Sequence, residues 1–420
     1  MPEAVRQPVP KETQTRQGFE RRTFLAVLVA ALGYFVDIYD LILFSIVRVP
    51  SLLGICVPDT DLLAKGVLLL NMQMAGMLVG GILWGVLGDK RGRLSVLFGS
   101  IAMYSIANAA NGLVNSVEAY AAWRFIAGVG LAGELGAGVT LVSEIMSKEA
   151  RGYGATIISA VGILGAIAAS LVGDWFNWRV AYFVGGGMGI ALLILRIGVA
   201  ESGLFEQVKY QGVSRGDFFL LFRTAERRMR YLAVILIGLP VWYVVGVLVT
   251  FAPEFGRAMG MSRIPSASRA VMFCYIGLSL GSLLSGTLSQ ILRTRKKVLG
   301  GFLAMTGLSI AIYFAFGGYS LWFFYLVCFM LGIGAGYWAI FVVIASEQFG
   351  TNIRATATTT VPNFVRGSVV PATFAFQYGI RYFGIEGSAI LVGAIAVVLA
   401  FLALGGLSET YGKDLDYLEQ

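Results

Sequence analysis

The stretch TFLAVLVAALGYFVDIYDLILFSIVRV, residues 23–49, decides the class of protein to which this chain belongs. A helix of this length rises about 40 Å, which exceeds the roughly 30 Å of hydrocarbon in a bilayer. The stretch is too long, and too rich in acidic residues, to be a cleaved signal peptide. It therefore predicts a membrane-spanning helix of the mature protein that carries two carboxylates, Asp37 and Asp40, within its apolar length.

The rest of the chain has the same apolar character. Of its 420 residues, 57% are hydrophobic and 13% are charged, and the mean hydropathy is +0.77. Such a chain is too apolar to be a water-soluble globule of this size. We predict an all-α membrane protein with twelve transmembrane helices. The spans are 23–49, 66–88, 94–113, 118–142, 153–173, 180–198, 231–252, 270–291, 298–317, 321–345, 355–382 and 387–406.

The longest connection, 199–230, divides these spans into two groups of six. We expect an N-terminal tail (1–22), a first bundle (23–198), a linker (199–230), a second bundle (231–406) and a C-terminal tail (407–420). Part of the linker predicts an amphipathic helix on the inner leaflet. Its residues are Phe218, Phe219, Leu221 and Phe222, followed by Arg223, Arg227, Arg228 and Arg230.

An internal repeat supports this division. Ser143-Glu144 followed by Arg151 recurs as Ser346-Glu347 followed by Arg354. Just upstream, Gly128-Val129-Gly130 is matched by Gly332-Ile333-Gly334. A chance similarity between Gly-rich helices is the alternative. A true repeat predicts two pseudo-symmetric bundles around a central cavity.

The basic residues predict the orientation. Alternate connections on one side of the membrane collect 23 of the 32 Lys and Arg residues, with Arg196 counted in the linker, and the opposite side collects 7, including Arg48. This asymmetry predicts that both termini are cytoplasmic, in an inner membrane. The net charge of +8 is thereby explained as a topology signal, and a nucleic-acid partner is not expected.

The composition also limits the chemistry. The chain has no His, and its three Cys residues are scattered without the spacing of a metal site or a disulfide framework. No ATPase signature is present, and the Gly runs lack the setting of a nucleotide loop. We expect neither an enzyme nor a bound metal, and an energy supply from an ion gradient.

The loop after the second span resembles that of a known family. Gly85-Val86-Leu87-Gly88-Asp89-Lys90-Arg91-Gly92-Arg93 is similar to the signature Gly-x-x-x-Asp-Arg-x-Gly-Arg loop of the major facilitator superfamily. The second half has Gln290 where this motif has its Asp. The stretches DIYD (37–40), WRFIAGVG (123–130) and GELG (133–136) resemble the metabolite:proton symporter and sugar-porter branches. The resemblance covers residues 20–406 and implies a transporter without a cofactor other than the coupling proton.

Charged residues interrupt the apolar spans, and those considered are Asp37, Asp40, Arg124, Glu134 and Arg366. Each would cost roughly 2.5 to 3.5 kcal/mol if unpaired in lipid, so these residues need partners or a wet cavity. Asp37 and Arg124 both lie about 9 Å below the outer surface by helix rise, so we expect them to pair. The pair is either a permanent structural bridge or a proton-dependent switch. Sugar-porter relatives use an acid of the first helix and an Arg of the fourth for coupling, and this resemblance favours the switch.

The other acids of the first bundle have two interpretations each. Asp40 and Tyr34 lie three positions from Asp37, on neighbouring parts of one helix face. Asp40 is either a second proton-binding group or a charge in the outer vestibule. Glu134, about 24 Å from the outer end of its helix, is either a further proton station or a partner in an inner gate.

Arg366 is the predicted substrate ligand. It lies about 16 Å into the eleventh span, near the midplane where transporters bind substrates. Its guanidinium offers a fork for a carboxylate or phosphate, and Asn363 and Gln377 could add polar contacts. Burial against an acid of another helix is the alternative. Candidate cavity walls, for which a lipid-facing position is the alternative, are Trp242, Tyr243, Tyr337 and Trp338.

A further set of charges lies at the predicted inner surface. We expect bridges of Glu144 with Arg151 and of Glu347 with Arg354 to close the inner side in the outward-open state. The signature loop contributes Asp89 and Arg93 to the same predicted gate.

The leading hypothesis is a monomeric, proton-coupled secondary transporter that moves a small organic anion through the bilayer by alternating access. Because three acids outnumber two arginines inside the spans, an organic cation or a zwitterion such as an amino acid or betaine is an alternative substrate, as is a sugar, and export is as open as import. A receptor that no longer transports is the alternative from another class of protein.

Overall fold

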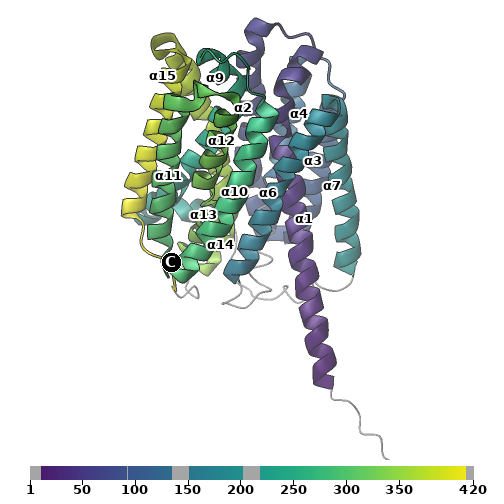
Figure 1. Ribbon diagram of the computed structural model, residues 1–420. Helices are drawn as coiled ribbons and strands as arrows, with labels where there is room; N and C mark the ends of the chain where they lie inside the picture. Colours follow the sequence, from purple (N-terminus) through teal and green to yellow (C-terminus); the bar gives the residue numbers. More distant parts are fainter. Residues whose placement is uncertain (1–10, 92, 135–150, 202–217, 413–420) are drawn as a thin grey trace, which may run out of the picture.

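The computed structural model describes residues 11–91, 93–134, 151–201 and 218–412. Within these ranges the chain is helical apart from turns and short connections, and it contains no strand. Figure 1 shows long helices side by side, with the first half of the chain on one side and the second half on the other. The C-terminal tail and the start of the first helix lie at one end of the bundle, and α9 (Ala252–Ala258) lies at the opposite end.

Six helices of the first half lie within the described residues. The first begins at Lys11, twelve residues before the predicted span, and extends below the bundle in Figure 1. The bounds of these six helices are α1 Lys11–Gly54, α2 Leu62–Arg91, α3 Arg93–Asn111, α4 Val117–Leu131, α6 Arg151–Trp175 and α7 Trp178–Glu201.

The second half repeats this plan with more interruptions. Its helices are α8 Ala225–Tyr243, α10 Ala267–Ile291, α11 Arg295–Phe316, α12 Leu321–Ala335, α13 Trp338–Glu347, α14 Thr351–Gly367 and α15 Val369–Gly406. A π-helical segment, Val244–Val249, continues α8. The tenth span is divided between α12 and α13, and the eleventh between α14 and the start of α15. Gly384, with φ 69°, separates the eleventh span from the twelfth within α15.

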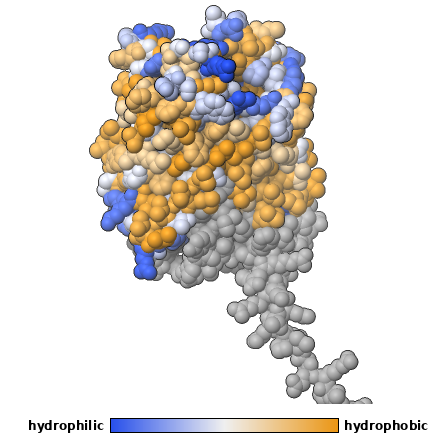
Figure 2. Space-filling view, viewed as in Figure 1, coloured by the Kyte–Doolittle hydropathy of each residue, from blue (hydrophilic) through white to orange (hydrophobic). Residues whose placement is uncertain are grey.

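These helices account for the twelve predicted spans. Eight helical stretches are long and apolar enough to cross a membrane, and the longest, Thr356–Gly406, contains two spans. The third, fourth and fifth spans correspond to α3, α4 and α6, whose described apolar lengths are shorter. Figure 2 shows apolar side chains around the middle of the visible face and hydrophilic ones gathered at the α9 end. The predicted fold class is confirmed.

Equivalent glycines pack the two halves in the same way. A Cβ on Gly76 would lie 2.1 Å from the carbonyl oxygen of Phe125, and a Cβ on Gly277 would lie 2.1 Å from that of Phe329. These positions are 201 and 204 residues apart in the chain. The pairs of α2 with α4 and α10 with α12 therefore cross at backbone contact in equivalent places, which is the geometry that a duplicated bundle requires.

The linker differs from the prediction. Phe218–Phe222 forms a short 3₁₀ helix, η3, and Arg227, Arg228 and Arg230 belong to α8. The Thr224 hydroxyl accepts a hydrogen bond from the N–H of Arg227, so α8 begins at Ala225. The predicted amphipathic helix over these residues is therefore wrong, because an N-cap starts the next spanning helix there.

Candidate functional site

The centre of the molecule contains an ion pair between the two halves. Nη2 of Arg366 in α14 lies 3.3 Å from Oδ2 of Asp37 in α1, and both side chains are fully buried. Sequence depth predicted Arg124 as the partner of Asp37, and this pairing is wrong in the structure. Depth fixes the level of a side chain along its helix, but the packing of the helices decides which neighbour the side chain faces.

Arg124 has other contacts. It donates a hydrogen bond to the side-chain oxygen of Gln73, and its guanidinium lies over the ring of Phe44 at 4.3 Å from the centroid. The side chain is fully buried, and its Nε and Nη1 have no hydrogen-bond partner among the described residues.

Asp40 lies inside the first bundle. Its side chain is fully buried, and a Cβ on Gly185 of α7 would lie 2.1 Å from its Oδ1. Asn108 and Arg124 are its polar neighbours. No part of Asp40 reaches the surface in this structure, and its two interpretations, a proton-binding group and a charge in the outer vestibule, stay predictions.

Aromatic side chains surround the central pair. The ring centroid of Trp242 lies 5.7 Å from Cζ of Arg366, and Trp338 meets Trp242 edge to face at 6.3 Å. Nε1 of Trp338 donates a hydrogen bond to the Tyr34 hydroxyl at 3.1 Å, which joins the halves a second time. Both indoles are buried, so the lipid-facing alternative is wrong for them.

The two neighbouring tyrosines point elsewhere. The Tyr243 hydroxyl donates to the carbonyl of Ala389 at 2.6 Å, and the Tyr337 hydroxyl donates to that of Ile237 at 2.9 Å. Both are buried and not lipid-facing, but each phenol serves helix packing. The structure thus separates them from the indoles with which the sequence grouped them.

The two amide side chains expected beside Arg366, Asn363 and Gln377, lie in different places. Nδ2 of Asn363 donates to the carbonyls of Ala132 and Thr359, both at 2.8 Å, so it ties α14 to the first half. Gln377 is half-buried in α15 and lies roughly 16 Å along the helix path from Arg366, too far to share its level. The grouping of Gln377 with Arg366 is therefore wrong.

Glu134 forms an ion pair within the first bundle. Its carboxylate accepts hydrogen bonds from Arg196 of α7 at 2.5 and 3.0 Å, and both side chains are at least nine-tenths buried. A Cβ on Gly33 would lie 2.2 Å from Glu134 Oε1, so the pair lies against α1 one turn from Asp37. Arg196 was not predicted as a partner of Glu134, because it lies at the linker end of the predicted sixth span.

Another ion pair between the halves closes the α9 end. Nη2 of Arg48 lies 2.6 and 2.8 Å from the two carboxylate oxygens of Glu254, and Arg48 is fully buried over the ring of Phe251. Thr250 donates a hydrogen bond to the Ser45 hydroxyl at 2.9 Å beside it. This contact was not predicted, because in the sequence Arg48 stands out only as a basic residue near the outer end of the first span.

Comparison with known proteins identifies the family. A sequence profile of the Major Facilitator Superfamily matches residues 23–370. The chain belongs to the Major Facilitator Superfamily. It is 26% identical over 325 residues to the niacin transporter NiaP of Acinetobacter baylyi, covering 68% of this chain and 72% of that one. It is 25% identical over 409 residues to the cis,cis-muconate transport protein of the same species, covering 94% and 95%.

Solved structures of the superfamily share the fold. The proton:xylose symporter XylE superposes with a TM-score of 0.71 and 17% identity, over 94% of this chain and 98% of that one. The chain is therefore a multi-pass membrane transporter with a small-molecule substrate, and it is not an enzyme. Among the residues with described positions, no group of three or more Cys, Asp and Glu side chains could hold a metal ion.

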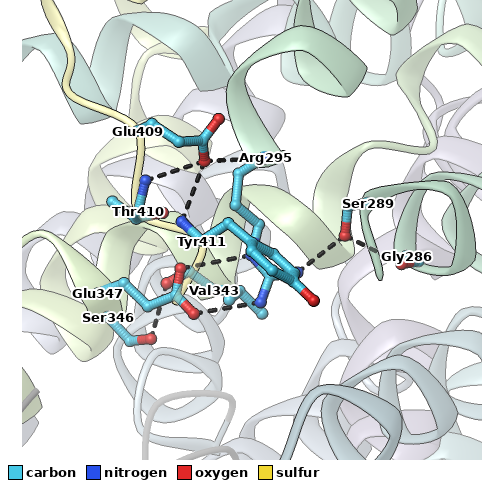
Figure 3. Close-up of polar contacts among 9 residues, drawn as sticks. All are labelled: Gly286, Ser289, Arg295, Val343, Ser346, Glu347, Glu409, Thr410 and Tyr411. Carbon is cyan, nitrogen blue, oxygen red and sulfur yellow. Dashed lines mark hydrogen bonds and ion pairs between the residues drawn. The ribbon is translucent and has the colours of Figure 1, made fainter. Parts of the chain in front are cut away.

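The superfamily's signature motif does not form a separate loop among the described residues: residues 85–91 are the end of α2, and Arg93 begins α3. The side chains of Asp89, Arg93 and Arg151, and all of Glu144, lie outside the described parts of the structure. In the second half, Glu347 pairs with Arg295 at 3.2 Å instead of with Arg354 (Figure 3). Arg354 donates to the carbonyls of Ser346 and Phe349, so the predicted partner of Glu347 is wrong. Arg295, the first residue of α11, supplies the cation.

The C-terminal tail adds an acid to this cluster. Glu409 accepts hydrogen bonds from the N–H groups of Arg295 and Tyr411 (Figure 3). It also accepts from the Thr294 hydroxyl at 2.5 Å and from the N–H of Lys296. Partial burial by itself would raise the pKa of Glu409, but these four bonds to the ionised form outweigh it and lower the pKa to about 2. The tail thereby caps the first turn of α11.

Proposed function

We propose that this protein is a proton-coupled secondary transporter that moves a small organic anion across the cytoplasmic membrane by alternating access. The observation that carries the proposal is the buried pair of Asp37 with Arg366, which joins the halves where a substrate would bind. Nε and Nη1 of Arg366 and Oδ1 of Asp37 have no hydrogen-bond partner among the described residues. The guanidinium can therefore bind a second carboxylate.

Charge balance couples the anion to a proton. Arg366 and Asp37 together are neutral, so a bound anion would leave one uncompensated negative charge in a buried site. An unpaired charge at this depth costs roughly 2.5 to 3.5 kcal/mol, or about two orders of magnitude in affinity. Protonation of Asp37 removes that charge and frees Arg366 for the substrate. Anion and proton are then carried together.

Alternating access follows from the same contacts. The pair of Arg48 with Glu254 holds the α9 end shut, and we assign this end to the outside, with both termini cytoplasmic. Asp40, Arg124 and the pair of Glu134 with Arg196 lie within the first bundle and are proposed further groups of the proton path. Two relatives support an anionic substrate, since niacin and muconate are carboxylates.

The test uses purified full-length protein in proteoliposomes with an imposed pH gradient. A thermal-shift screen of carboxylates, sugars, amino acids and betaines first identifies a substrate, because only a true ligand stabilises the fold. Asp37→Asn should abolish uphill accumulation and retain exchange, whereas Asp174→Asn, which changes an exposed acid, should accumulate normally. Arg366→Ala should lose anion binding far more than Arg366→Lys. Accumulation by Asp37→Asn at the wild-type level would refute the coupling role.

A further inference from the structure

The surroundings of Arg366 are aromatic on the side of the second half. Trp242 lies under the guanidinium, and Trp338 meets Trp242 at an interplanar angle of 67°. Phe341 stacks on Trp338 with centroids 4.9 Å apart. A carboxylate that replaces Asp37 on Arg366 therefore directs its carbon skeleton toward aromatic rings. Such rings attract another aromatic ring by edge-to-face or offset contacts beyond simple burial.

The two indoles differ in their hydrogen bonding. Nε1 of Trp338 is engaged by the Tyr34 hydroxyl. Nε1 of Trp242 is buried and has no partner among the described residues. An unpaired buried donor is unfavourable, and a ligand atom that accepts from it removes the penalty. Trp242 thus offers a directional contact that an apolar wall would lack.

We infer that the substrate is a planar aromatic carboxylate whose ring carries a hydrogen-bond acceptor. The carboxylate replaces Asp37 on Arg366 and binds Nη2 together with Nε or Nη1. The ring packs against Trp242 and Trp338, and the acceptor faces Nε1 of Trp242. This inference rests on the proposed function and makes it more specific. Trp242 is then the residue that distinguishes among aromatic acids, because its N–H is the directional donor beside the ring.

The first experiment measures binding to the full-length wild-type protein by competition and thermal shift. The probes are benzoate, cyclohexanecarboxylate, benzamide and the three pyridine carboxylates. Benzoate should bind about 3- to 10-fold more tightly than cyclohexanecarboxylate, which has the same size but no aromatic face. At least one pyridine carboxylate should exceed benzoate by about 10-fold, since the two differ by a single ring atom that can accept a hydrogen bond. Benzamide should not compete.

The second experiment assigns the selectivity to a residue. Trp242→Phe keeps an aromatic ring and removes the N–H, so the affinity ratio of the best pyridine carboxylate to benzoate should fall to about 1. Trp338→Phe is the matched control, because the N–H that it removes is already bound to Tyr34. It should keep the wild-type ratio. A ratio that survives Trp242→Phe would overturn the role of Trp242, and the wild-type series tests the aromatic class even if a variant fails to fold.

The outcomes separate this inference from the proposed function. If cyclohexanecarboxylate binds as well as benzoate, and Arg366→Ala abolishes both, the anion transporter stands and the aromatic site is wrong. If none of the carboxylates binds in a manner that depends on Arg366, the proposed function fails and the inference fails with it.

Discussion

The pair of Arg48 with Glu254 gives a quantitative prediction about the conformational equilibrium. The two residues come from different halves, α1 and α9, so their contact exists only while the α9 ends of the halves meet. Arg48 is fully buried, and the Glu254 side chain is 10% exposed. Removing one partner of a buried pair costs about 3 to 5 kcal/mol. Glu254→Gln can still accept one hydrogen bond, so we take the lower figure.

A cost of about 3 kcal/mol changes the ratio of closed to open protein roughly 100-fold. The assay is modification of a cysteine at position 45 by a membrane-impermeant maleimide. Ser45 is 3% exposed and lies under the closed end beside Thr250, so Ser45→Cys reports opening. The exposed native Cys56 is first replaced by Ser to remove background.

In this background, Glu254→Gln should raise the modification rate toward 100-fold. Glu118→Gln is the control, because it neutralises an exposed acid in the first turn of α4 without breaking an ion pair given by the structure. Equal rates in the two variants would refute the reasoning that this pair holds the halves together.

Three further predictions concern folding and stability. Gly128→Val should prevent accumulation of folded protein, because a Cβ there would lie 2.1 Å from a backbone carbonyl oxygen. Gly187→Ala is the control and should be neutral, because a Cβ there has nothing within 4 Å. Size-exclusion profiles of the two variants test this difference. Glu134→Gln should lower the melting temperature by leaving the buried Arg196 without its partner, at a cost of about 3 to 5 kcal/mol, and a second change of Arg196→Gln should restore part of the loss. The pKa of Glu409 is lowered from 4.5 to about 2, so its hydrogen bonds stabilise the protein fully above pH 4.5 and are lost as the pH falls toward 2. The difference in melting temperature between wild type and Glu409→Gln should therefore be full at pH 7 and should disappear between pH 4.5 and pH 2.

The spans could be predicted from the sequence because the bilayer imposes their length. The interruption within the eleventh span could be anticipated only in part. The span contains Pro362 and Pro371, either of which can bend a helix. α14 continues through Pro362 and ends at Gly367, and Ser368, three residues before Pro371, separates it from α15. A proline in the first turn of a helix costs no hydrogen bond, so the break falls ahead of Pro371. The sequence shows both prolines, but it does not show near which of them the helix is interrupted.

The partners of the buried charges could not be predicted in the same way. Helix rise places Asp37 and Arg124 at one level, but the side chain that faces Asp37 is Arg366 of the other half. Adjacent residues can also face different neighbours. The ring of Trp242 lies beside Arg366, whereas the hydroxyl of Tyr243 donates a hydrogen bond to the carbonyl of Ala389 in α15. A step of one residue turns a helix by about 100°, and only the arrangement of all helices determines what each direction meets.

The π-helical segment Val244–Val249 stands between Trp242 and the contacts made by Thr250 and Glu254. Its wider winding accommodates one residue more than an α-helical turn would. Rewinding it as ordinary α-helix would rotate the chain beyond it by roughly 100°. Thr250 and Glu254 would then lose their contacts with Ser45 and Arg48. The one extra residue of the π-helical segment therefore couples the position of Trp242 at the centre to the ion pair at the α9 end.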